Sequence, residues 1–92
     1  MSKRILIVED QFLIALNIED AVLALGHHVV AIAGSTLEVE RVNDTIDIAL
    51  VDVNLLDGVT GPQIGRDLAA KGIKVIFMTA NQEAVAGGIP GT

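Results

Sequence analysis

Short apolar runs alternate with longer stretches of helical character along the chain, and this alternation restricts the folds that the chain can adopt. The apolar runs are rich in β-branched residues, as strands buried on both faces of a parallel sheet are. They comprise residues 4–8, 28–33, 45–53 and 73–78. Because strands that alternate with helices form parallel sheets with right-handed crossovers, the order β-α-β-α-β-α-β predicts an α/β fold with a doubly wound parallel sheet.

The first helical stretch, residues 11–25, carries more apolar residues than a single stripe requires. Apolar residues that share one broad face of a helix normally pack against the core. We therefore expect a core face on this helix. Its members are Phe12, Leu13, Leu16, Val22, Leu23 and Leu25.

Helix-boundary residues stand where this order of elements requires them. Gly26 follows the first helical stretch, and residues 35–38 form a capping box that opens a short second helix. Pro62 suits the first turn of a third helix, and Gly72 suits its end. No linker, repeat or low-complexity tract divides the 92 residues, so we expect residues 1–92 to form a single domain.

The composition excludes several classes of protein. Hydrophobic residues make up 51% of the chain but aromatic residues only 2%, so the core must be aliphatic. The absence of cysteine excludes disulfides and thiolate metal sites. A net charge of −6 with scattered Lys and Arg residues provides no basic face, so we expect no nucleic-acid partner. The apolar runs are too short for a membrane span or a signal peptide, so we expect no membrane partner and a cytoplasmic location.

Polar side chains follow three of the expected strands directly. Glu9 and Asp10 follow the first strand, Asp52 follows the third, and Thr79 follows the fourth. In an open parallel sheet, ligands bind in the crevice beyond the carboxyl ends of the strands. Acids that converge there repel one another unless a cation is present, and Mg²⁺ prefers carboxylate oxygens. An acidic Mg²⁺ site beside a hydroxyl suggests phosphoryl chemistry.

Each of these residues also has a structural explanation when taken alone. Asp10 could cap the helix that follows it, because acidic residues favour helix N-termini. Asp52 could be a turn residue after a strand, and Thr79 could make a backbone hydrogen bond at a strand end. Asp57, which precedes Gly58, is better explained by a turn than by a site. The combination of the acids at neighbouring strand ends favours the metal site.

Taken together, these segments resemble the receiver domain of bacterial two-component response regulators. The resemblance rests on residues 5–10, 49–55, 57–58 and 75–80, in this order and at these separations, and it covers nearly the whole chain. It implies a flavodoxin-like receiver fold with the strand order 2-1-3-4-5. The 92 residues match this fold through its fourth strand and lack the fifth strand and the last helix.

The resemblance implies a Mg²⁺ site with specific ligands. Asp10 matches a direct ligand, and Glu9 matches an acidic neighbour that usually acts through water. The backbone carbonyl of Asn54 matches the group that completes the site. Asp52 matches the phosphoacceptor, which also contacts the metal.

The resemblance also implies a signalling role rather than an ordinary enzymatic one. Asp52 would accept a phosphoryl group from a histidine kinase or a histidine phosphotransfer protein, with at most self-catalysed phosphorylation and dephosphorylation. Thr79 matches the hydroxyl that binds the phosphoryl group when the domain switches, and Ala80 matches the small residue that keeps the pocket open. Family members also use the first helix for kinase docking, and the sequence does not separate that use from core packing.

One departure from the family pattern leaves alternatives open. The family has a lysine after its fifth strand, and no lysine follows Thr79 here. We therefore expect impaired phosphotransfer by this form, and a phosphorylation-independent interaction module remains an alternative. A nucleotide-binding enzyme is disfavoured, because no glycine-rich phosphate-binding motif follows the first strand. Residues 73–78 would form an apolar edge strand, so we expect a homodimer or larger assembly.

Overall fold

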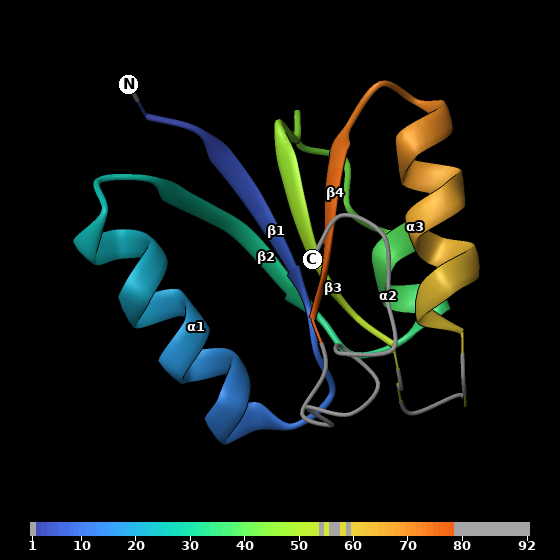
Figure 1. Cartoon of the computed structure of the whole chain (residues 1–92), viewed down its shortest axis with the longest axis horizontal. Coiled ribbons are helices and arrows are strands. Elements are labelled where there is room, and N and C mark those ends of the chain that lie inside the picture. The colour runs from blue at the N-terminus through green and yellow to red at the C-terminus, as the bar shows by residue number, and fades with distance from the viewer. Residues whose placement is uncertain (1, 54, 56–57, 59, 79–92) are drawn as a thin grey trace.

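The computed structural model describes residues 2–53, 55, 58 and 60–78. Its helices and strands follow one another in the predicted order (Figure 1). They are β1 (Arg4–Val8), α1 (Phe12–Ala24), β2 (His28–Ala33), α2 (Thr36–Glu40), β3 (Ile48–Asp52), α3 (Gly61–Ala70) and β4 (Lys74–Met78). Within this described part, no helix is long and apolar enough to cross a lipid bilayer.

The strands form one parallel sheet in the order β2-β1-β3-β4. Helix α1 covers one face of the sheet, and α2 and α3 cover the other face (Figure 1). The predicted α/β doubly wound sheet is therefore confirmed, with these strands in the order that the resemblance implied. The order places β1 between β2 and β3, which makes β1 the most buried strand.

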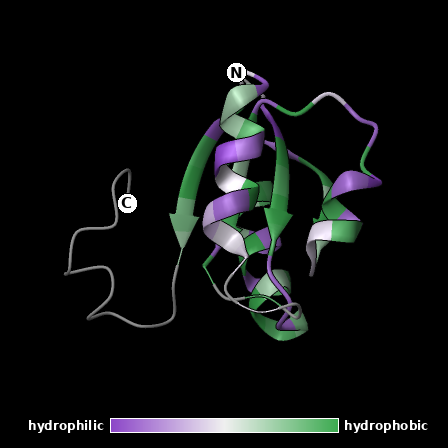
Figure 2. Cartoon of the chain, turned by 90° about the vertical axis from the view of Figure 1, so that its right-hand side faces the viewer, coloured by the Kyte–Doolittle hydropathy of each residue, from purple (hydrophilic) through white to green (hydrophobic). Residues whose placement is uncertain are grey.

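The core has two layers because side chains alternate along each strand. Leu6 and Val8 of β1 face α2 and α3, where they pack with Ile64 and Leu68 of α3. Ile5 and Ile7 belong to the layer under α1. Figure 2 shows the strands mainly in hydrophobic colours, whereas α3, which lies in front, carries both polar and apolar residues.

The core face predicted for α1 is correct at Val22 but wrong for most of its members. Most of its members are exposed, and their exposed fractions lie between 51% and 76%. The exposed residues are Phe12, Leu13, Leu23 and Leu25. The helix packs on the sheet through the predicted Val22 and through Ala15, which was not predicted, with the partly buried Ile18 between them. Because α1 is apolar on nearly every side, its periodicity did not indicate which side faces the sheet.

The helix boundaries follow the predicted signals. Ser35 Oγ accepts a hydrogen bond from the Glu38 N–H at 3.3 Å, and Glu38 Oε1 accepts one from the Gly34 N–H at 2.8 Å. Ser35 therefore caps α2 as predicted, whereas Glu38 reaches back to the N–H of Gly34, the residue before the N-cap, rather than to that of Ser35. Gly26 and Gly72 follow α1 and α3 with φ values of 86° and 87°, which favour glycine.

The third strand is shorter than predicted. It begins at Ile48 rather than at residue 45. The Asp47 carboxylate accepts a hydrogen bond of 2.8 Å from the Arg4 N–H. The side chain of Asp47 therefore helps to connect the starts of β1 and β3.

Candidate functional site

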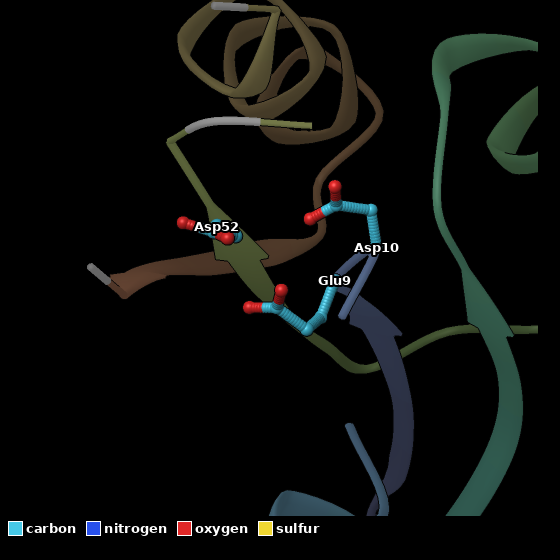
Figure 3. A group of neighbouring side chains, drawn as sticks. All are labelled: Glu9, Asp10 and Asp52. Carbon is cyan, nitrogen blue, oxygen red and sulfur yellow. The ribbon is translucent and has the colours of Figure 1, made fainter. Parts of the chain in front are cut away.

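The carboxyl ends of β1 and β3 bring the three predicted acids together. The two strands are adjacent and pair Val8 with Val51, so the residues that follow them emerge at the same edge of the sheet. Ligand oxygens of Glu9, Asp10 and Asp52 all lie within 4.8 Å of one another. Figure 3 shows Glu9 and Asp10 at the end of β1 and Asp52 at the end of β3.

Backbone hydrogen bonds hold both strand ends in place. The Glu9 N–H donates to the Ala33 carbonyl of β2 at 2.8 Å. The Val53 N–H, immediately after Asp52, donates to the Met78 carbonyl of β4 at 3.2 Å. The ladder of the sheet therefore continues past β1 and β3, and it orders the backbone that carries the acids.

Two of the three acids are buried. The exposed fractions of Glu9 and Asp52 are 6% and 9%, whereas Asp10 is partly exposed. Burial raises the pKa of the Glu9 carboxyl to about 7 because it penalises the charged form. The Gln11 N–H, which donates to Glu9 Oε1 at 3.0 Å, opposes this rise, and the neighbouring Asp52 and Asp10 carboxyls add to it. Ionisation of all three carboxyls is therefore unfavourable in this site when no cation is bound.

These residues fit a hard divalent cation. The cluster offers only carboxylate oxygens, which are the ligands that Mg²⁺ prefers. A cation among them would offset the negative charge of Asp52 and Asp10, which adds to the effect of burial on the pKa of Glu9. The alternative role of Asp10 as a helix cap finds no support, because α1 begins after Gln11 and has no side-chain cap among the described residues.

Several predicted site residues lie outside the described residues. They are Asn54, Thr79 and Ala80, and Asp57, for which a turn was predicted, also lies there. Their predicted roles stay predictions. Of the neighbouring described residues, Leu55 and Gly58 exchange backbone hydrogen bonds of 2.9 and 3.0 Å.

Gly61 is a residue near the site that sequence reasoning missed. It is the buried first residue of α3 and lies against the backbone of Asp52 and Val53. Its position before Pro62 indicated only a loop and a helix start. This contact joins the start of α3 to the end of β3, which are separate elements, so signals within either element did not reveal it.

Comparison with known proteins identifies relatives along most of the chain. No protein-family model matches the sequence. The chain is 36% identical over 87 residues to the phyllosphere-induced regulator PhyR of Methylorubrum extorquens, an alignment that covers 90% of this chain and 33% of the relative. The chain thus spans about a third of the length of the curated relative it matches.

Solved structures of similar proteins share the fold and about a third of the aligned residues. The solution structure of the PhyR response regulator REC domain of Erythrobacter litoralis superposes with a TM-score of 0.83 at 31% identity, covering 95% of this chain and 70% of that one. The anti-anti-sigma factor PhyR of Bartonella quintana, solved in complex with the anti-sigma factor NepR, gives a TM-score of 0.79 at 35% identity. That match covers 98% of this chain and 39% of that one.

Proposed function

Because this chain belongs to the receiver domains of response regulators, we propose that Asp52 accepts a phosphoryl group from a histidine kinase or a histidine phosphotransfer protein. One observation carries the proposal. Ligand oxygens of Glu9, Asp10 and Asp52 lie within 4.8 Å of one another at the carboxyl edge of a parallel sheet. Ligands of open α/β sheets bind at this edge.

In this proposal, Asp52 acts as the nucleophile. One of its carboxylate oxygens forms a bond to phosphorus while the bond between phosphorus and the donor histidine nitrogen breaks. The electron pair of the broken bond stays with the imidazole. The product is an acyl phosphate on Asp52. The low exposure of Asp52, at the end of β3, limits the access of water.

Glu9 and Asp10, with Asp52 and the proposed carbonyl of Asn54, would hold Mg²⁺. The bound cation supplies positive charge that offsets the negative charge of the carboxylates and of the phosphoryl oxygens. Glu9 must release its proton to take part, because its pKa is raised to about 7. We also propose that Thr79 donates a hydrogen bond to the phosphoryl group when the domain switches.

A second proposal concerns the output of the longer protein. The PhyR relative from Bartonella quintana is an anti-anti-sigma factor that was solved with the anti-sigma factor NepR. We propose that the protein containing this domain likewise binds an anti-sigma factor, and that phosphorylation of Asp52 controls this binding. A phosphoryl group adds about −1.5 to −2 charges near pH 7, which is enough to bias a two-state surface.

The test is phosphorylation by a small-molecule donor. Residues 1–92 and a form extended along the parent gene are incubated with acetyl phosphate and Mg²⁺, and intact mass is measured. We expect one phosphoryl group per chain, added more slowly to residues 1–92. Asp52→Asn should abolish the mass gain, whereas Asp20→Asn, on the exposed part of α1, should leave it unchanged. No phosphoryl gain by either wild-type form would overturn the proposal.

Partner binding separates this proposal from the phosphorylation-independent alternative. If Asp52 acts as a switch, Asp52→Ala should alter the affinity of the extended form for its partner. If neither Asp52→Ala nor a phosphodonor changes the affinity for the partner, the result would favour a constitutive interaction module. The expected homodimer or larger assembly stays a separate prediction, which light scattering at tens of micromolar protein would check.

A further inference from the structure

The peptide unit that joins Asp52 to Val53 is held from two sides. On one side, its N–H group donates to the Met78 carbonyl of β4 at 3.2 Å. On the other side, its carbonyl oxygen lies against Gly61, the first residue of α3. The Gly61 N–H also donates to the Val53 carbonyl at 3.1 Å. The backbone of Asp52 is thus clamped between β4 and α3.

Space, rather than backbone conformation, requires glycine at position 61. Gly61 is not among the described glycines with positive φ. A Cβ there would overlap the Asp52 carbonyl oxygen and would lie 2.7 Å from Val53 Cα and 2.8 Å from the Val53 carbonyl oxygen. These neighbours are backbone atoms, which cannot rotate away as a side chain can.

We infer that Gly61 is a positioning residue for Asp52. Its lack of a side chain lets α3 begin directly on the peptide unit that carries the Asp52 carbonyl. A methyl group at this place must push that unit away from α3, and the displacement moves the Asp52 carboxylate relative to Glu9 and Asp10. The inference rests on the proposed function, because it concerns the site that would hold Mg²⁺ and receive the phosphoryl group.

Gly65 provides a matched control in the same helix. It is also buried, and a Cβ there would meet the Phe77 ring and, at 3.3 Å, Val75 Cγ1. Both neighbours are side chains of β4. Gly65→Ala therefore strains the packing of α3 on the sheet without touching the peptide unit of Asp52.

The first experiment compares Gly61→Ala with Gly65→Ala by Mg²⁺ titration of the metal-free protein, followed by NMR, alongside thermal unfolding. We expect Gly61→Ala to weaken Mg²⁺ binding by about tenfold or more, as lost supporting contacts around a metal site do. Gly65→Ala should lower Tm without shifting the Mg²⁺ midpoint. Equal Mg²⁺ midpoints in Gly61→Ala and Gly65→Ala would mean that Gly61 contributes only to the packing of α3. This result would overturn the inference.

The second experiment needs no variant and remains decisive if Gly61→Ala does not fold. In the wild-type protein, the Gly61 amide resonance should shift during the Mg²⁺ titration with the same midpoint as those of Glu9 and Asp10. The Gly65 amide should stay unchanged. If the amide resonances of Glu9 and Asp10 shift with Mg²⁺ but that of Gly61 does not, the inference about Gly61 is overturned and the Mg²⁺ site is kept. A wild-type protein without any response would overturn the Mg²⁺ site itself, and the inference with it.

Discussion

The backbone N–H of Gln11 donates a hydrogen bond of 3.0 Å to the side-chain carboxyl of Glu9, two residues earlier in the chain. This bond favours the ionised form of Glu9 and opposes the effect of burial on its pKa. The bond links the start of α1 to the acidic cluster. A change at the start of this helix should therefore alter the pKa of Glu9.

Removing this donor should raise the pKa of Glu9 further. Gln11 has φ −83°, close to the φ of proline, so Gln11→Pro deletes the N–H without a large change in the φ of this residue. A hydrogen bond to a charged group contributes about 1.5–3 kcal/mol, so we expect a rise of about one pKa unit or more. NMR titration of the Glu9 carboxyl carbon measures the change. Gln11→Ala keeps the N–H, and identical titration curves for the two variants would contradict the prediction.

The metal-free domain should lose stability as pH rises from about 4.5 to about 7. The folded chain retains a proton on Glu9 that the unfolded chain has lost between the ordinary pKa of 4.5 and the raised value of about 7. The free energy of unfolding therefore decreases across this window, by up to about 3 kcal/mol for Glu9 alone. Urea unfolding at several pH values without Mg²⁺ gives the slope.

The contribution of Glu9 is isolated by substitution. The Gln side chain of Glu9→Gln cannot ionise. Between pH 5 and pH 8, the free energy of unfolding of this variant should therefore decrease less than that of the wild type, and the difference should be about the 3 kcal/mol expected for Glu9. Glu19→Gln on α1 serves as the control and should follow the wild type. Saturating Mg²⁺ should also remove most of the decrease. Parallel curves for the wild type and Glu9→Gln would rule out a protonated, buried Glu9.

Mg²⁺ should stabilise the fold through Asp10. Binding to the folded state alone raises the free energy of unfolding in proportion to the logarithm of the Mg²⁺ concentration above the dissociation constant. Asp10→Ala removes one of the three converging carboxylates, so the rise in Tm with Mg²⁺ should largely disappear. Differential scanning calorimetry with and without Mg²⁺ makes the comparison, with Asp20→Asn as control. Stabilisation that survives Asp10→Ala would refute the ligand assignment.

Two neighbouring residues of α1 should respond very differently to truncation. Val22 is 5% exposed and Leu23 is 51% exposed. Val22→Ala should destabilise the domain by about 1–3 kcal/mol, because it leaves a cavity under the helix. Leu23→Ala should change stability by about 0.5 kcal/mol or less, although it removes more atoms. Chemical denaturation compares the two variants, and a larger loss for Leu23→Ala would mean that α1 packs with the opposite face.

Local patterns in the sequence were enough to predict most elements and the positions of the acids within them. Ser35 caps α2 as predicted, and β2 has the predicted bounds, because capping bonds and apolar runs act between residues close along the chain. Glu9, Asp10 and Asp52 directly follow apolar runs, which alone predicted that they end strands. The family resemblance then supplied the strand order that makes them neighbours.

The tertiary structure decided which surfaces meet. In α1, apolar residues occur around most of the helix, and only docking on the sheet selected Ala15 and Val22 for burial while Leu13 and Leu25 stayed exposed. The same holds for Gly61, whose contact with Asp52 depends on how closely α3 approaches the end of β3. Periodicity and capping encode contacts between near neighbours in the chain, whereas these contacts arise only when separate elements pack together.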